Sequence, residues 1–237
     1  MSNRQKKSKW QETSQAARLS KVATETTSRD KTQRSYDLRE RKRTRTRLII
    51  QTEALRLFAE KGYAQTTVEE IADAAAISPR TFFRYFPSKE DVVLWDEYDP
   101  LALDLLLARP DDEALLETFR AIIRETLGAL YRRDPERLLI RIRLAATVPE
   151  VRARFLDAQT HGVEELAEQL AEKRGARVDA LTLRVAASAM IATVSVTADI
   201  WQSGGGKADL LALFDEATET LAAVARGLAA KPATTGA

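Results

Sequence analysis

Apolar residues recur at three- and four-residue spacing in one segment after another from Leu48 onwards, and this spacing is the strongest constraint on the fold. The 237 residues include only 9 glycines and 7 prolines, and several of these lie where one periodic segment gives way to the next. Each such segment must bury its apolar face against another helix. We therefore predict an all-α fold of about nine helices without strands.

The predicted helices begin at residues that are common at helix N-termini. Thr67 with Glu70 forms a capping box before the second helix, and Ser78 followed by Pro79 begins the third. The fourth helix can end near Pro100 or continue to Ala108. The predicted ranges are 41–61, 68–75, 79–86, 89–98 (or 89–108), 112–131, 135–146, 150–173, 177–202 and 207–229.

Charge is distributed very unevenly along the chain, although the formal net charge is only +2. Residues 1–47 hold 15 Lys and Arg against 5 Asp and Glu, a net charge of +10, and the remainder has a net charge of −8. A basic end on an acidic body is typical of a protein whose one end meets a polyanion. A solvated tail without a partner explains the same distribution, so charge alone leaves both interpretations open.

The second and third predicted helices are short, lie close together in the sequence and follow a longer helix, as in a helix-turn-helix unit. The helix that begins at Pro79 would then be the recognition helix, which enters the major groove of DNA. Phe82 and Phe86 are four residues apart, so we expect them on its buried face.

Residues 46–95 carry three motifs that resemble the DNA-binding domain of the TetR family of bacterial transcription regulators. The motifs are Phe58-Ala59-Glu60-Lys61-Gly62-Tyr63, Thr66-Thr67-Val68-Glu69-Glu70-Ile71-Ala72 and Ser78-Pro79-Arg80-Thr81-Phe82-Phe83-Arg84-Tyr85-Phe86-Pro87-Ser88-Lys89-Glu90. Residues 112–230 also resemble the C-terminal domain of the branch that binds acyl-coenzyme-A-like ligands. One departure is Ala76, which stands in the turn where the family usually has glycine.

The resemblance implies a particular division of the chain. Residues 1–40 would be a disordered basic tail, 41–90 the DNA-binding domain, 91–230 the ligand-binding and dimerisation domain, and 231–237 a disordered C-terminus. The implied function is a ligand-responsive, sequence-specific regulator that binds a palindromic operator as a homodimer. Repression with release by a small molecule is the expected mode, and activation remains an alternative.

The expected DNA contacts combine base reading with phosphate binding. Arg80 can form two hydrogen bonds with guanine, and Thr81 and Arg84 can reach the same groove. By resemblance, Phe83 faces a sugar or a thymine methyl group. The full set of expected DNA-binding residues is Arg45, Arg47, Thr67, Ser78, Arg80, Thr81, Phe83, Arg84, Tyr85 and Lys89.

The body of a ligand-responsive regulator needs an internal site for a small molecule, which the resemblance implies is acyl-coenzyme-A-like. The candidates for ligand contacts are Trp95, Tyr98, Phe119, Ile123, Leu127, Phe155, Thr193, Thr197 and Trp201, although ordinary core packing is the commoner role for any one such residue. The small residues of 186–192 and the segment 210–228 are the predicted dimer interface.

Several classes of protein fit the sequence poorly. The chain has no cysteine and a single histidine, His161, so we expect no catalytic residues, metal site or cofactor. Gly204-Gly205-Gly206-Lys207 lacks the spacing of a phosphate loop. The apolar run 185–198 is bounded by Arg184 and Asp199, which predicts a cytoplasmic protein without a membrane span. A nucleoid-type protein that binds DNA without sequence preference remains an alternative.

Overall fold

A computed structural model describes residues 39–175 and 178–226, which fall into two compact units, residues 1–48 and 49–237. The predicted tail therefore lies outside the described residues apart from its last two positions, and so does the predicted C-terminus. In the first unit, residues 39–48 are helical from Arg39, two residues before the predicted start. Five of their six arginine and lysine side chains are exposed to solvent.

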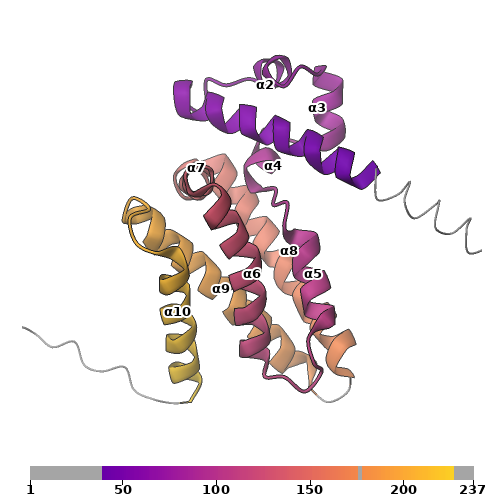
Figure 1. The fold of residues 1–237 in the computed structure, drawn as a ribbon, viewed down its shortest axis with the longest axis vertical. Helices are drawn as coiled ribbons and strands as arrows, with labels where there is room; N and C mark the ends of the chain where they lie inside the picture. The colour runs from indigo at the N-terminus through magenta and orange to yellow at the C-terminus, as the bar shows by residue number, and fades with distance from the viewer. Residues whose placement is uncertain (1–38, 176–177, 227–237) are drawn as a thin grey trace, which may run out of the picture. The chain divides into compact units, whose positions relative to one another are not determined.

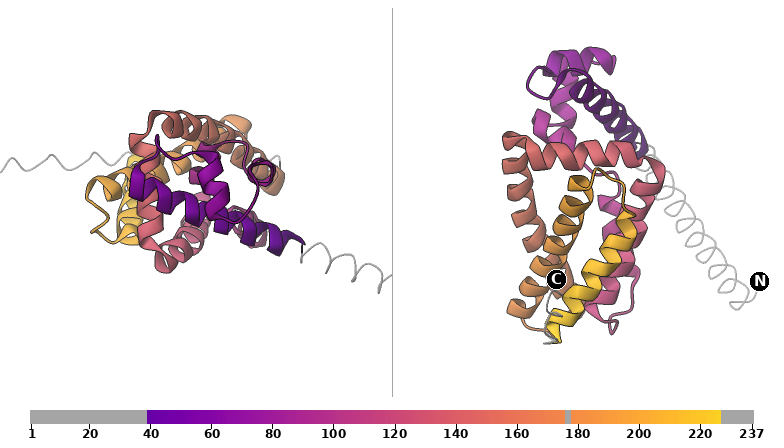
Figure 2. Two further views of the ribbon diagram at one scale, coloured as in Figure 1. Left: turned by 90° about the horizontal axis from the view of Figure 1, so that it is seen from above. Right: turned by 90° about the vertical axis from the view of Figure 1, so that its left-hand side faces the viewer.

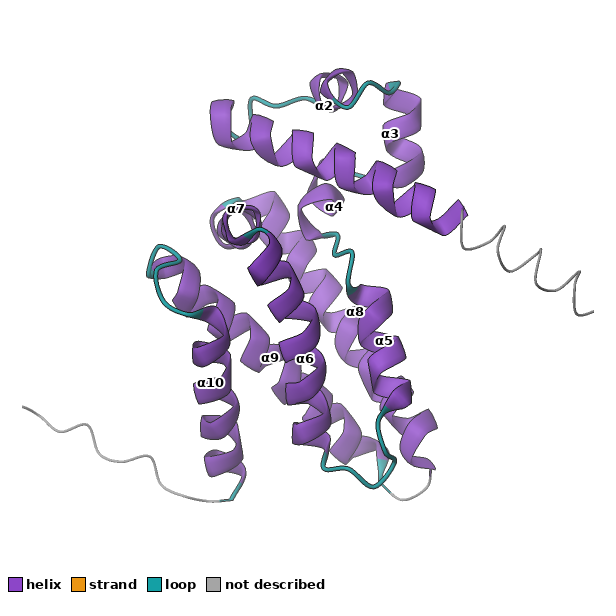
Figure 3. Cartoon of the chain, in the orientation of Figure 1, coloured by secondary structure: helices purple, strands orange, loops and turns teal. Residues whose placement is uncertain are grey.

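The second unit contains only helices and their connections in its described part (Figures 1 and 3). Its first element is helical over residues 49–61. The helices that follow are α2 (Val68–Ala74), α3 (Pro79–Tyr85), α4 (Lys89–Leu94), α5 (Asp99–Ala108), α6 (Leu115–Arg133), α7 (Pro135–Thr147), α8 (Pro149–Arg174), α9 (Ala180–Ser203) and α10 (Leu210–Ala225). The prediction of an all-α fold is confirmed.

The helices α5 to α10 each contact the next along the chain, and α10 returns to contact α6 (Figure 2). Three apolar clusters fill the space between them. One joins α5, α6, α8 and α9 around Leu106 and Leu183, and a second joins α6, α7, α9 and α10 around Trp201. The third forms around Phe119 and Phe214, whose ring centroids are 5.6 Å apart. Interlocking of these helices stabilises the body.

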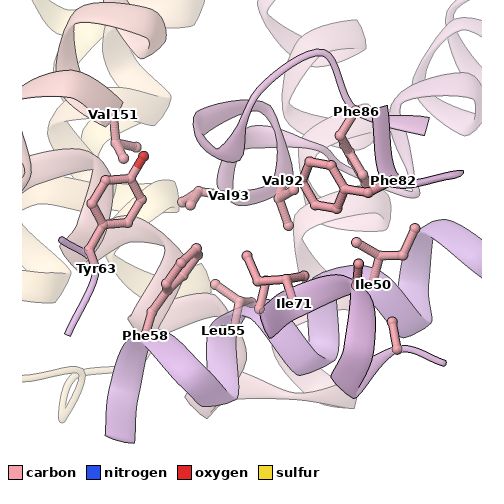
Figure 4. Close-up of a cluster of buried hydrophobic side chains, with 13 residues drawn as sticks. Ile50, Leu55, Phe58, Tyr63, Ile71, Phe82, Phe86, Val92, Val93 and Val151 are labelled. Atoms are coloured by element: carbon pink, nitrogen blue, oxygen red, sulfur yellow. The ribbon is translucent and has the colours of Figure 1, made fainter. Parts of the chain in front are cut away.

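A separate apolar cluster holds residues 49–61, α2, α3 and α4 together (Figure 4). Phe82 on α3 is fully buried against Ile50 and Ile71, and Phe58 packs on Tyr63 with 4.9 Å between ring centroids. Val151 of α8 completes the cluster. We call residues 49–95 the head and residues 98–226 the body.

One predicted helix is divided in the structure. The continuation of the fourth helix to Ala108 is wrong, because α4 ends at Leu94 and α5 begins at Asp99. Trp95 has an extended conformation with ψ of 131°, and the backbone N–H of Tyr98 donates to the Asp96 side chain at 2.9 Å. The described residues consequently hold ten helices, where the sequence predicts about nine.

The turn between α2 and α3 places a residue other than glycine in the left-handed region. Ala76 has φ of 54°. Its N–H donates to Asp73 O at 3.0 Å, and the N–H of Ile77 donates to Ala72 O at 2.9 Å. These two bonds form a Schellman motif, in which glycine normally takes the place of Ala76. The left-handed conformation costs alanine roughly 1 kcal/mol.

Helix α9 corrects the sequence argument about the apolar run 185–198. The helix has 24 residues and an 18-residue window with mean hydropathy of 1.5, so length and composition alone would allow it to cross a membrane. Only 22% of that window is buried. The helix therefore presents apolar side chains on its outer face as well as on its inner face.

We expect Ala76→Gly to raise the free energy of unfolding by about 1 kcal/mol, because glycine adopts the left-handed conformation without a steric cost. Urea titration followed by circular dichroism measures this. The matched control is Ala74→Gly at the exposed last residue of α2, which should lower stability by up to about 1 kcal/mol because glycine is the poorer helix former. Equal losses for both variants would contradict the strain at Ala76.

Candidate nucleic-acid interface

The start of α2 is held by the predicted capping box. Thr67 Oγ1 accepts from Glu70 N at 3.2 Å, and the N–H of Thr67 donates to Glu70 Oε2 at 2.9 Å. Lys61 forms an ion pair with the same carboxylate. The bond from Lys61, followed by that from the Thr67 backbone, lowers the pKa of Glu70 to about 2. Glu70 thus already occupies the N–H of Thr67, and a phosphate contact at Thr67 stays a prediction.

The next helix, α3, begins as the sequence predicts. Ser78 Oγ accepts from Thr81 N at 3.1 Å, and the two hydroxyl groups lie 2.9 Å apart. Pro79 occupies the first turn, where its missing N–H costs no hydrogen bond. Ser78 therefore fixes the position of Thr81, and both hydroxyl groups are engaged with each other in this structure.

Helix α3 has a buried face that holds aromatic residues and an exposed face that holds both arginines of the helix. Phe82 and Phe86 are 0% and 2% exposed, which confirms their predicted place in the core. Arg80, Phe83 and Arg84 are exposed. Three exposed side chains therefore stand on one short helix whose opposite face is packed in the head core.

Phe83 is the large apolar residue that this surface presents, with 53% of its area exposed. Its ring stands edge-on to Phe82, with centroids 5.4 Å apart and planes at 85°. The Arg84 guanidinium lies 5.2 Å from the centroid of the half-buried Tyr85 ring. These contacts restrict the side chains of Phe83 and Arg84 before any partner binds.

Lys89, an expected phosphate ligand, is instead tied to the loop before α2. Its Nζ donates to Tyr63 O at 2.9 Å and to Thr66 O at 3.0 Å, and it lies 4.1 Å from the centroid of the Tyr63 ring. The Tyr63 hydroxyl donates to Glu90 at 2.5 Å. Burial, followed by this bond, raises the pKa of Tyr63. One ammonium hydrogen of Lys89 remains for a phosphate, so its DNA contact stays a prediction.

Arg45 and Arg47 lie in the first unit, where Arg45 is exposed and Arg47 is half-buried. The unit that contains them is separate from the unit that contains the head, and the expected DNA contacts of both arginines stay predictions.

Comparison with known proteins identifies this head. Residues 50–94 match the model of the bacterial regulatory proteins of the tetR family, and residues 113–226 match the MftR C-terminal domain. The transcriptional regulator TcmR of Streptomyces glaucescens is 34% identical over 168 residues, which cover 68% of this chain and 74% of TcmR. The chain belongs to the TetR family. It is accordingly a DNA-binding transcription regulator and not an enzyme.

Two further relatives match more than half of this TetR-family regulator. MftR of Mycobacterium tuberculosis is 30% identical over 142 residues, which cover 58% of this chain and 70% of MftR. The structure of Thermus thermophilus FadR, a TetR-family repressor in complex with lauroyl-CoA, is 25% identical. It matches with a TM-score of 0.51 over 81% of this chain and 99% of FadR.

The expected ligand contacts do not form one group in this TetR-family body. Tyr98, Leu127 and Trp201 belong to one apolar cluster, and the Trp201 indole N–H donates to Ala208 O at 2.9 Å. Phe119 and Ile123 belong to a second cluster. These five residues therefore line two neighbouring parts of the body, and their ligand contacts stay predictions.

The other four candidates lie elsewhere. Trp95 packs on the head core, with its ring 6.0 Å from Phe86, and Phe155 is half-buried on α8. The buried hydroxyl groups of Thr193 and Thr197 donate to carbonyls one turn back in α9. Sequence reasoning passed over the buried polar side chains Gln51, Arg137 and Arg141, because nothing in the local pattern separates them from solvated residues.

We expect Arg80→Ala and Arg84→Ala each to weaken operator binding by about 1–3 kcal/mol and to relax base preference, because each removes a potential guanine contact. Fluorescence anisotropy on a selected operator and on a scrambled duplex measures both effects. Arg152→Ala on α8, an exposed arginine far along the chain from α3, is the matched control and should bind normally. Equal losses on the two duplexes would remove the base-reading role.

Proposed function

We propose that this TetR-family regulator is a ligand-responsive repressor that binds a palindromic operator as a homodimer. The observation that carries the proposal is the exposed face of α3, which presents Arg80, Phe83 and Arg84 on a helix held in place by the buried Phe82 and Phe86. A single α3 covers only a few base pairs. Two copies related by a dyad would read two half-sites about 34–36 Å apart or somewhat more, which is the geometry of a palindrome.

The outer face of α9 supports the homodimer. Leu181, Val185, Val196 and Ile200 are 73%, 59%, 55% and 53% exposed. Their spacing places them on one side of the helix, together with the exposed Ala192. Burial of such a stripe against a second copy would remove apolar surface from water and add close helix packing at the small residues of 186–192. The α10 segment of the predicted interface adds Val224, which is 65% exposed.

An acyl-coenzyme-A-like effector is the ligand class we favour. FadR of Thermus thermophilus carries lauroyl-CoA, and its similarity to this chain extends over most of the body. The two apolar clusters around Trp201 and Phe119 share the helices α6, α9 and α10, and an acyl chain would have to enter between these helices. A soluble protein of this family that acts on chromosomal DNA would work in the cytoplasm.

Selection of bound sequences from a random DNA pool tests the proposed function as a whole. The expected result is a palindromic sequence. A promoter that carries this palindrome should express its reporter more weakly in the presence of the regulator. Recovery of no common sequence would instead support the nucleoid-type alternative, and a reporter that is driven more strongly would support activation. Addition of lauroyl-CoA to the bound operator should release the protein.

Phe83→Ala should weaken binding only where the operator presents a thymine methyl group to this ring, because that methyl is the apolar group of the major groove. Thymines in the selected operator are replaced one at a time by deoxyuridine, which lacks the methyl. At one position, replacing thymine by deoxyuridine should lower the affinity of the wild-type protein. The same replacement should leave the affinity of the Phe83→Ala variant unchanged. If no thymine behaves in this way, Phe83 contacts the sugar instead.

Val185→Glu or Val196→Glu should abolish the homodimer, because association would bury a charge in apolar surface at an expected cost of several kcal/mol. Size-exclusion chromatography with light scattering at micromolar concentration gives the mass. Leu107→Glu, an exposed apolar residue of α5, is the matched control and should remain dimeric. A wild-type protein that is already monomeric would refute the proposed dimer.

A further inference from the structure

The C-terminal end of α4 has an unusual set of hydrogen-bond partners. The last carbonyl groups of any helix have no partner inside the helix. Here four successive carbonyls, from Val92 to Trp95, accept from only two side chains. Gln51 Nε2 donates to Val92 O at 2.8 Å and to Trp95 O at 2.9 Å. Arg141 donates to Val93 O through Nε at 2.9 Å and to Leu94 O through Nη2 at 3.3 Å.

The two side chains come from different parts of the fold. Gln51 belongs to the first helix of the head and is 1% exposed, whereas Arg141 lies in the middle of α7 in the body and is 9% exposed. The positive guanidinium at the negative end of α4 adds an electrostatic contribution. The carboxylate of Asp96 lies 3.6 Å from Arg141 Nη1. We call this arrangement of Gln51, Arg141 and the four carbonyls the α4 clamp.

Neighbouring ion pairs extend the attachment of α4 and the turn after it to the body. Arg154 of α8 contacts Asp91 at 2.9 Å. Arg137, one turn before Arg141 on α7, contacts Glu97 at 2.9 Å, and both side chains are less than 10% exposed. The α4 clamp differs from these pairs because it alone places a side chain from the head and a side chain from the body on the same four carbonyls.

We propose that Gln51 and Arg141 are positioning residues that fix the head against α7 and thereby set the half-site spacing that the dimer accepts. The inference rests on the proposed palindromic operator. Base reading is assigned to the exposed side chains of α3, which take no part in the hydrogen bonds of the clamp, whereas the distance between two recognition helices depends on how each head is held by its own body. Loosening of the clamp should therefore change spacing tolerance and leave base preference intact.

The variants are chosen to weaken the clamp while keeping its polarity. Arg141→Lys retains the positive charge, but a single ammonium on a flexible stem does not match the planar donors that serve two carbonyls. Gln51→Asn retains the amide but is one methylene shorter, so it cannot reach both Val92 O and Trp95 O. Arg143→Lys, an exposed position on the same helix, is the matched control. Thermal unfolding establishes that each variant is folded.

Affinity is measured for the selected palindrome, for palindromes with one base pair added to or removed from the spacer, and for half-sites with one altered base. The wild-type protein and Arg143→Lys should show a large penalty for altered spacing. In Arg141→Lys and Gln51→Asn this penalty should fall by about 10-fold, while the penalty for an altered base stays unchanged.

Two outcomes overturn the inference, and they differ from failure of the proposed function. A spacing penalty that is unchanged in either folded variant would show that the clamp does not set the spacing. Equal loss on all duplexes would show that the clamp has a structural role alone. Recovery of a single half-site in place of a palindrome would overturn the dimeric operator itself, and with it the basis of this inference.

Discussion

Burial of Phe82 and Phe86 in the head core determines what α3 can present to a partner. With seven residues, the helix makes about two turns, so fixing two aromatic positions four residues apart leaves one orientation for the rest. Arg80, Phe83 and Arg84 are exposed as a direct consequence. A weaker core would let this short helix rotate or fray, and the three side chains would lose their common direction.

The three short helices of the head depend on caps and tertiary contacts for their existence. Helices of six or seven residues are not stable alone in water. Each here has a side chain that accepts from its first turn: Thr67 for α2, Ser78 for α3 and Ser88 for α4. The sequence allows prediction of these elements because capping is local and Ser-Pro or Thr-x-x-Glu can be recognised without knowledge of the fold. The Schellman turn at Ala76 is similarly local, although its alanine breaks the usual rule.

Contacts between distant residues explain what the sequence could not provide. The chain leaves the helix at Trp95, whose carbonyl accepts a hydrogen bond from the Gln51 side chain. The two residues are 44 positions apart, so no local sequence pattern predicts this bond. Arg137 and Arg141 have the spacing of solvated arginines on an amphipathic helix, yet both are buried against α4 and the turn after it. The candidate ligand contacts were chosen for apolar character and helical position. Those properties do not state which cluster a residue joins, so Trp95 proved to belong to the head and Tyr98 to the body.

The membrane-like composition of α9 is explained by its two apolar faces, an inner face packed in the body and an outer face exposed on the regulator's surface. Its inner face buries Leu183, Met190 and Trp201 in the body, and its outer face exposes leucine, valine and isoleucine side chains. A helix that is apolar all round needs cover on both sides. The hydroxyl groups of Thr193 and Thr197 donate to carbonyls within the helix. The charged residues Arg184 and Asp199 flank the apolar run, so a protein surface can cover its outer face as well as lipid could. In the proposed homodimer, a second copy would provide a matching surface because the same stripe would face itself across a dyad. That dyad is also the symmetry that the proposed palindromic operator requires.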